Sequence, residues 1–227
     1  MRAALSDSAR VIAVVGLARE ARIAEGEGVH AVIGGGDEAG LSDALRRALR
    51  QGAAGIVSFG ISGGLDPALK PGACIVGSAV SLGRERWRTD AAWSKRLLAA
   101  LPRAQFAEVT GIDHPAATVE HKRLLRSMTG AAAVDMESHV AGRIAAEAGL
   151  PLAILRIICD PAGRSLPPAA LAGMRRDGTT NIGAVLGAVF ARPAQLLAMI
   201  GLAGDARVAF SELKRRRASA GAGFALD

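Results

Sequence analysis

The chain has 227 residues, which corresponds to one large domain or at most two. Hydrophobic residues make up 50% and charged residues 22%, a composition that excludes wholesale disorder and fibrous structure. The net charge of +7 favours anionic partners, but only 3% of residues are aromatic and tyrosine is absent, which argues against a stacking surface for nucleic acid.

The first half of the chain alternates short apolar runs with glycine-rich turns. Strands are predicted over residues 11–16, 29–33, 56–59 and 73–80. The apolar face of residues 41–49 predicts a helix that ends before Gly52. Residues 60–64 are expected to form a glycine loop after the third strand.

The second half continues this alternation. Helices are predicted over residues 93–101, 120–128 and 140–148, strands over 107–112 and 152–158, and either element over 132–136. From Ile182 the pattern predicts two helices broken at Arg192 and Pro193, followed by a basic tail at 214–217. We therefore expect an α/β domain over residues 1–181, and C-terminal apolar helices over 182–227 that pack on it or extend it.

This order of elements predicts an α/β fold with a mostly parallel sheet that is buried on both faces. In such sheets a ligand binds beyond the carboxyl ends of the strands. The residues that directly follow predicted strands are therefore the site candidates: Arg19, Gly34–Gly36, Gly60–Gly64, Asp113 and Asp160.

Two glycine motifs have a functional and a purely structural interpretation. Gly34, Gly36 and Gly40 follow a strand and open a helix, which fits a dinucleotide-binding loop or simply a tight turn. A short-chain dehydrogenase would need a catalytic tyrosine, which the sequence lacks. Residues 60–64 match the G-x-S-x-G motif of α/β hydrolases, but the turns that follow lead into a strand and not a helix, so an esterase is disfavoured.

Other residues bear on the type of chemistry and on location. Cys74 and Cys159 lie far apart in apolar runs, so no disulfide and no metal site is expected. No motif calls for an organic cofactor.

The N-terminal residues resemble no secretory signal, which predicts a cytoplasmic protein. The apolar stretch 182–203 fits a spanning helix poorly but has a composition that suits the surface of a membrane.

Acidic residues at the ends of predicted strands in the second half of the chain suggest acid–base chemistry. Asp135 and Glu137 lie at the start of a predicted helix, where capping explains one acid better than both. Asp160 ends a hydrophobic strand, where apolar surroundings raise the pKa of a carboxyl group as a general acid requires. Arg156 within that strand needs a buried carboxylate as its partner.

Three segments match the motifs of a known family. Residues 59–65 (FGISGGL) and the LKPG turn at 69–72 resemble T-G-S-A-G-G-L and the turn after it, 134–137 (VDME) resembles V-E-M-E, and 156–162 (RIICDPA) resembles R-A-I-S-D-x-A. The chain thus resembles the purine nucleoside phosphorylase and methylthioadenosine nucleosidase superfamily over most of its length. This resemblance implies a three-layer fold in which helices flank a central, mostly parallel, twisted sheet.

Shorter motifs at 135–139, 149–151 and 160–170 look most like those of the hopanoid-associated phosphorylases. Members of that group are thought to remove adenine from adenosylhopane, a triterpenoid joined to C5′ of adenosine, in hopanoid biosynthesis. The resemblance therefore implies nucleoside metabolism, with an adenine nucleoside that carries a hydrophobic 5′ substituent as substrate. It also implies a homodimer, and the C-terminal segment suits peripheral contact with the inner face of a membrane.

The resemblance also implies roles for individual residues. Asp160 matches the general acid that protonates the purine at N7, Glu137 and Met136 match the pair that binds ribose, and Ser62 and Gly63 match the wall beside the base.

Arg19 lies where nucleosidases carry a glutamate that orients water. An arginine binds phosphate and cannot act as a base, so the resemblance favours a phosphorylase with inorganic phosphate as co-substrate. Glu20, the next residue, could instead orient water, which leaves phosphate-independent hydrolysis by a methylthioadenosine/adenosylhomocysteine-type nucleosidase as the alternative. A non-enzymatic protein that binds membranes through its C-terminal segment is a further alternative.

Overall fold

All side chains of β1 (Val11–Val15) are buried, because helices cover both faces of the sheet. Successive residues of a strand point to opposite faces. Val11, Ala13 and Val15 pack into one apolar cluster, and Ile12 and Val14 into a second cluster across the sheet. The continuous apolar run that predicts this strand is thus a consequence of two-sided burial.

The computed structural model describes residues 10–172, 178–179, 181, 183, 187–188 and 191–226. In this part of the chain the sheet has eight strands in the order β2-β1-β3-β7-β6-β4-β5, and β8 pairs with β3 and β4. The remaining strands are β2 (Val29–Ile33), β3 (Gly55–Gly64), β4 (Cys74–Leu82), β5 (Glu85–Arg88), β6 (Gln105–Gly111), β7 (Ala133–Asp135) and β8 (Leu152–Asp160).

Parallel pairing joins the strands that carry the site candidates. β1, β2, β3 and β8 run parallel, so their carboxyl ends meet at one edge of the sheet. β7 is parallel to β6 and pairs antiparallel with the end of β3. β8 also pairs antiparallel with β4, so that β3, β7, β6, β4 and β8 form a closed ring of pairings. This ring brings the ends of β7 and β8 next to the end of β3.

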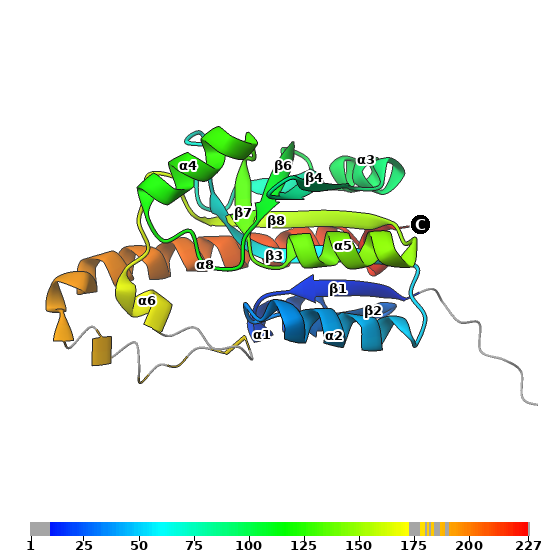
Figure 1. Cartoon of the computed structure of the whole chain (residues 1–227), viewed down its shortest axis with the longest axis horizontal. Coiled ribbons are helices and arrows are strands. Elements are labelled where there is room, and N and C mark those ends of the chain that lie inside the picture. The colour runs from blue at the N-terminus through cyan, green and yellow to red at the C-terminus, as the bar shows by residue number, and fades with distance from the viewer. Residues whose placement is uncertain are drawn as a thin grey trace, which may run out of the picture.

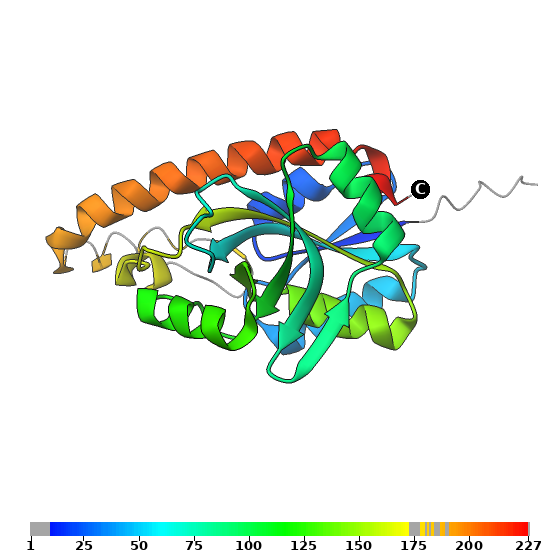
Figure 2. The same ribbon diagram turned by 90° about the horizontal axis from the view of Figure 1, so that it is seen from above.

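The helices form two layers, which confirms the expected three-layer α/β fold (Figures 1 and 2). Side chains of α1 (Ala18–Ala24), α3 (Ala91–Ala100) and α8 (Leu196–Ser219) pack in the cluster of Val11. Side chains of α2 (Glu38–Leu49) and α5 (Ser138–Ala148) pack in the cluster of Ile12. Figure 2 shows α8 and α5 on opposite sides of the sheet. The other helices among the described residues are α4 (Val119–Thr129) and α6 (Pro168–Ala172), with 3₁₀ turns at Pro193–Gln195 and Ala222–Ala225.

The predicted glycine loop at 60–64 is instead the end of strand β3. Its residues pair with β8, and the register shifts between Ser62 and Gly63. Gly60 has a φ of +153°, and an added Cβ there would lie 2.5 Å from Glu20 Oε1, so both backbone conformation and space require glycine. The hairpin formed by β4 and β5 was not predicted either, because the four residues of β5 are mostly exposed and polar.

The basic run at 214–217 belongs to helix α8, which corrects the expectation of a tail. Arg216 donates a hydrogen bond to the Pro102 carbonyl at 2.7 Å, and Arg217 donates one to the Ala24 carbonyl at 2.9 Å. The Arg217 guanidinium also lies 4.3 Å from the centre of the Phe224 ring. The hydrogen bonds to Pro102 and Ala24 fasten the C-terminal helix to the sheet domain.

The first of the two helices expected after Ile182 lies mostly outside the described residues. The second is α8, where Leu196, Leu197 and Ile200 are exposed. Among the described residues no helix has the length and hydrophobicity needed to span a bilayer. Membrane contact through this segment, cytoplasmic location and the homodimer stay predictions.

Candidate active site

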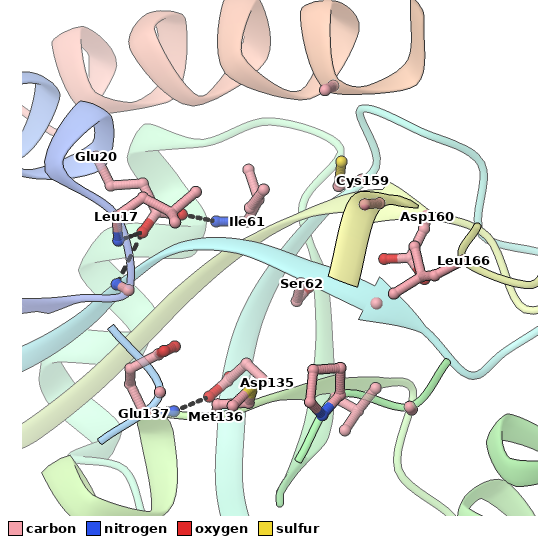
Figure 3. Close-up of a pocket in the computed structure, with 18 of the residues that line it drawn as sticks. Leu17, Glu20, Ile61, Ser62, Asp135, Met136, Glu137, Cys159, Asp160 and Leu166 are labelled. Carbon is pink, nitrogen blue, oxygen red and sulfur yellow. Dashed lines mark hydrogen bonds between the residues drawn. The ribbon is translucent and has the colours of Figure 1, made fainter. Parts of the chain in front are cut away.

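A cavity of about 370 Å³ lies at the carboxyl ends of the parallel strands. Of the predicted site residues, Ser62 and Gly63 reach it from β3, Met136 and Glu137 from the turn after β7, and Asp160 from the end of β8. Figure 3 shows Glu137 at one end of the cavity and Asp160 at the other, with Ser62 between them. The fold thus brings together residues that are up to 98 positions apart.

Asp160 is buried and has a charged partner that the sequence did not reveal. The ammonium group of Lys122, in α4, contacts Asp160 Oδ2. Burial raises the pKa of the Asp160 carboxyl group above its ordinary value, and the contact with Lys122 partly opposes this rise. Asp160 is therefore a carboxyl group with increased affinity for its proton, which suits a general acid.

Asp135 and Glu137 have different functions, although they are two residues apart. Asp135 Oδ1 accepts hydrogen bonds from the amides of Glu137 and Ser138 at 2.9 and 2.7 Å, so Asp135 satisfies free amides at the start of α5. Its Oδ2 lies 3.0 Å from Nε of Arg156, which is fully buried. This contact supplies the carboxylate partner that was predicted for Arg156.

Glu137 makes no capping bond, and its side chain extends along the cavity wall. Its Oε2 lies 3.5 Å from the Arg156 guanidinium. An added Cβ at Gly16 would lie 2.8 Å from Glu137 Oε1, so this glycine lets the carboxylate approach the end of β1. Burial raises the pKa of Glu137 to about 8, with a contribution from the nearby acids, while Arg156 opposes the rise.

Glu20, the alternative to Arg19 at the sequence level, is buried and lines the cavity from α1. Its Oε2 accepts hydrogen bonds from the amides of Gly16 and Leu17, both at 2.8 Å, and its Oε1 accepts one from Ile61 at 2.7 Å. Each carboxylate oxygen can accept two hydrogen bonds, and Oε1 accepts one from the described residues, so it retains capacity for one more donor. Burial raises the pKa of Glu20, and Arg156 partly opposes this.

Arg19 does not line the cavity. Its exposed guanidinium lies 4.1 Å from the centre of the Phe210 ring, on the side of α1 that faces α8. Successive residues of a helix differ by about 100° in direction, and in α1 Glu20 points into the cavity while Arg19 points toward Phe210 of α8. The packing of α1 places the glutamate inward, contrary to the expectation for Arg19.

The rest of the cavity wall is mostly apolar. Ser62 is buried, and among the described residues its Oγ has no hydrogen-bond partner, so it is available to a ligand. Beyond Asp160 the wall is formed by residues of α6, α8 and the segment before α6: Leu166, Ala170, Leu171, Leu202, Ala206 and Phe210. The cavity wall therefore has one part with acidic side chains and the Ser62 hydroxyl and another part that is apolar.

The charged side chains among the described lining residues are all acidic: Glu20, Asp135, Glu137 and Asp160. An acidic cavity disfavours an anion and suits polar hydrogen donors such as ribose hydroxyls, water or a protonated base.

A separate group that has the composition of a metal site, Glu38, Asp113 and His139, lies outside this cavity. Glu38 already forms an ion pair with Arg143 at 2.9 Å.

Comparisons with known proteins agree with this architecture. The sequence model described as "Phosphorylase superfamily" matches residues 22–191. No curated protein matches the chain. Among the solved structures that share the fold are three that are each 14% identical to this chain.

The 5′-methylthioadenosine/S-adenosylhomocysteine nucleosidase of Neisseria meningitidis, in complex with methylthio-immucillin-A, has a TM-score of 0.66, with 92% of this chain and 97% of that chain covered. The nucleosidase of the same name from Campylobacter jejuni has a TM-score of 0.61, with coverages of 81% and 96%. Futalosine hydrolase of Helicobacter pylori has a TM-score of 0.58, with coverages of 67% and 88%.

Proposed function

Because the chain belongs to the phosphorylase superfamily, we propose that it is an enzyme that cleaves the N-glycosidic bond of an adenine nucleoside. The observation that carries this proposal is the placement of the carboxyl groups in one cavity. Asp160 stands at one end and Glu137 and Glu20 at the other, and between them lies the hydroxyl of Ser62, which has no hydrogen-bond partner in the described part of the chain (Figure 3). The similarity to nucleosidases that act on methylthioadenosine and S-adenosylhomocysteine supports adenine as the base.

In the proposed reaction the bond between N9 of the base and C1′ of the ribose breaks, and its electron pair moves to the purine. The Asp160 carboxyl group donates its proton to N7, which neutralises the leaving base. The ribose acquires positive charge at C1′. Glu137 accepts hydrogen bonds from the ribose hydroxyls, Met136 lies beside the sugar, and Ser62 and Gly63 border the base.

We propose water as the nucleophile. Glu20 has one free acceptor position on Oε1 and a raised pKa, so it is suited to orient a water molecule and remove its proton. The acidic cavity does not favour phosphate, and Arg19 lies outside it. Phosphorolysis, which the resemblance favoured, is therefore the alternative outcome of the test below.

The apolar side of the cavity supports a hydrophobic 5′ substituent on the nucleoside. Leu202, Ala206 and Phe210 of α8 line it together with residues of α6, and none of these side chains is charged. The resemblance to hopanoid-associated phosphorylases makes adenosylhopane the most specific candidate. Removal of its adenine would be a step in hopanoid biosynthesis.

The proposal is tested by adenine release from adenosylhopane, 5′-methylthioadenosine and adenosine, each with and without inorganic phosphate. We expect release without phosphate, preference for the hydrophobic 5′ substituent, and loss of release in Asp160→Asn. Strict dependence on phosphate would transfer the proposal to phosphorolysis. Absence of adenine release from all three nucleosides, or full turnover by Asp160→Asn, would overturn it.

The apolar side of the cavity has its own matched test. Leu202 lines the cavity, whereas Leu197 on the same helix is 81% exposed. Leu202→Asp should lower kcat/KM for adenosylhopane about tenfold or more relative to adenosine, because burial of an apolar side chain contributes roughly 1.5–3 kcal/mol. Leu197→Asp should leave the ratio of the two substrates unchanged. An equal effect of both variants would contradict the assigned position of the 5′ group.

A further inference from the structure

Lys122 is a fully buried lysine on α4, and its ammonium group has three acceptors. It contacts Asp160 Oδ2 and donates hydrogen bonds to the carbonyls of Pro161 at 3.0 Å and Arg164 at 2.8 Å. The three acceptors match its three N–H groups, so the ammonium group is held in one orientation. A buried ammonium ion is costly unless it is fully hydrogen-bonded, so this position is specific for a cation.

From this contact we infer that Lys122 is a positioning residue of the general acid: it selects the oxygen of Asp160 that carries the transferable proton and stabilises the carboxylate left after transfer. This inference rests on the proposed glycosidic cleavage. It assigns a role to a residue that touches neither the base nor the ribose.

The choice of oxygen follows from the contact itself. Oδ2 accepts a hydrogen from Lys122, and the ammonium group has no acceptor capacity to receive a proton from that oxygen. The acidic proton of Asp160 therefore sits on Oδ1. Because Asp160 lines the cavity and Lys122 does not, Oδ1 is the oxygen available to N7 of a bound purine.

The ammonium group also acts on the energy of proton transfer. Before transfer a neutral carboxyl group faces Lys122, and afterwards a carboxylate does. The attraction between Lys122 and Asp160 is thus stronger in the product of the transfer than in the ground state. An interaction that grows along the reaction lowers the barrier, and it does so strongly where water is excluded.

The same contact predicts the effect of Lys122 on pH dependence. Lys122 lowers the pKa of Asp160, which burial raises. A general acid is active only while protonated, so activity is lost as the pH rises through this pKa. Removal of the ammonium charge should raise that pKa and move the alkaline limb of kcat/KM to higher pH.

The test compares Lys122→Met, Lys122→Gln and Lys122→Arg with wild type. The control is Lys95→Met, since Lys95 is an exposed lysine on α3. Two substrates are used: 5′-methylthioadenosine, and 4-nitrophenyl β-D-ribofuranoside, whose leaving group needs no protonation at nitrogen. The full pH profile of kcat/KM is recorded for each variant, together with kcat and KM.

We expect the Met and Gln variants to lose roughly 10- to 100-fold in kcat on the nucleoside, a part of the 10²–10⁴ that general acid catalysis contributes. Their KM should change little, and their alkaline limb should move to higher pH. On the nitrophenyl riboside they should stay within about threefold of wild type, because no general acid is needed. Lys122→Arg should restore the limb to its wild-type position, since it keeps the charge.

A purely structural role of Lys122 would lower turnover of both substrates alike and leave the alkaline limb in place, and that result would overturn the inference. If the Met and Gln variants do not fold, Lys122→Arg still decides: an alkaline limb displaced from that of wild type would contradict a role based on charge. Failure of wild type to release adenine from adenosylhopane, 5′-methylthioadenosine and adenosine alike would instead refute the proposed function.

Discussion

Exchange of Glu20 for glutamine tests whether Glu20, which would activate water, or Arg19, which would bind phosphate, serves the nucleophile. Glutamine has the same shape, but one carboxylate oxygen becomes an NH₂ group that cannot accept a hydrogen bond. The least costly orientation turns this group toward the Ile61 amide, which loses one hydrogen bond of 2.7 Å and keeps those to Gly16 and Leu17. One unpaired buried donor costs about 1–3 kcal/mol, so we expect a folded variant with lowered stability.

The turnover of Glu20→Gln should fall by a larger factor than this loss of stability would explain. Loss of a general base lowers turnover by roughly 10²–10⁴-fold. Arg19→Ala removes only the exposed contact with Phe210, and such a contact contributes about 0.5–1 kcal/mol, equivalent to at most about fivefold in rate. Glu25→Gln, at an exposed acid that directly follows α1, is the matched control and should be silent.

The assay is adenine release by the three variants across pH, with unfolding in urea measured in parallel. In wild type, burial raises the pKa of Glu20, and a base is active only when ionised, so activity should be lost as the pH falls through this raised value. In Glu20→Gln this acidic limb should disappear. The reasoning is refuted if Arg19→Ala abolishes turnover while Glu20→Gln retains it, because Arg19 would then bind the nucleophile.

Three further predictions concern stability as well as activity. Burial raises the pKa of Glu137 to about 8, above its value in the unfolded chain, so ionisation of this group costs stability as the pH rises from about 4.5 to about 8. Glu137→Gln should therefore have a higher Tm than wild type at pH 9 and little difference at pH 4. Its turnover should fall about 10- to 100-fold, because a hydrogen bond to a charged group contributes about 1.5–3 kcal/mol. Equal Tm values at pH 9 would contradict the buried, proton-binding state of this carboxyl group. Arg156→Met leaves the buried acidic side chains of Asp135 and Glu137 without their cation and should lower the free energy of unfolding in urea by about 3–5 kcal/mol. Arg46→Met, which breaks an exposed ion pair, should lower it by less than about 1 kcal/mol, and similar values for both variants would be evidence against the buried network. Gly77→Ala places a methyl group 2.6 Å from a buried isoleucine of β8, so it should lower the Tm and reduce the free energy of unfolding by about 1–3 kcal/mol. Gly163→Ala is the control, because the space around Gly163 is open, and it should leave the Tm unchanged. A Tm of Gly77→Ala equal to that of wild type would show that the two strands can separate.

Much of the fold could be predicted from local patterns. β1, β2 and α2 lie where the apolar runs and the helical face at 41–49 predict them. β8 extends its predicted run by two residues, to Asp160. Defined faces of these elements are buried, so apolar residues recur along each element at the spacing of a strand or helix and can be recognised from neighbouring residues alone.

Elements that depend on a distant partner were predicted less well. Residues 60–64 have the composition of a loop, but pairing with β8 makes them a strand. β5 is short and mostly exposed, and pairing with β4 is what makes it a strand. Local propensity carries little information where the hydrogen bonds of a segment go to residues far along the chain.

The candidate site divides in the same way. The motifs at 134–137 and 156–162 were sufficient to place Met136, Glu137 and Asp160 in one cavity, because each motif follows a strand whose carboxyl end defines the site. Neither motif indicated Lys122, which reaches Asp160 from a helix 38 residues away. A single lysine on a polar helix has no pattern that distinguishes it from a surface residue.

The choice between Arg19 and Glu20 was decided by tertiary structure alone. The two residues are adjacent, so the sequence places both of them at the carboxyl end of β1. The rotation of α1 about its axis determines which side chain enters the cavity, and that rotation depends on the packing of Ala21 and Ala24 against the sheet. The sequence by itself thus determined the order of elements and the acids at strand ends, through patterns of neighbouring residues. Only the folded chain determined which charge faces the cavity and which cation faces the acid, because those contacts are made across the fold.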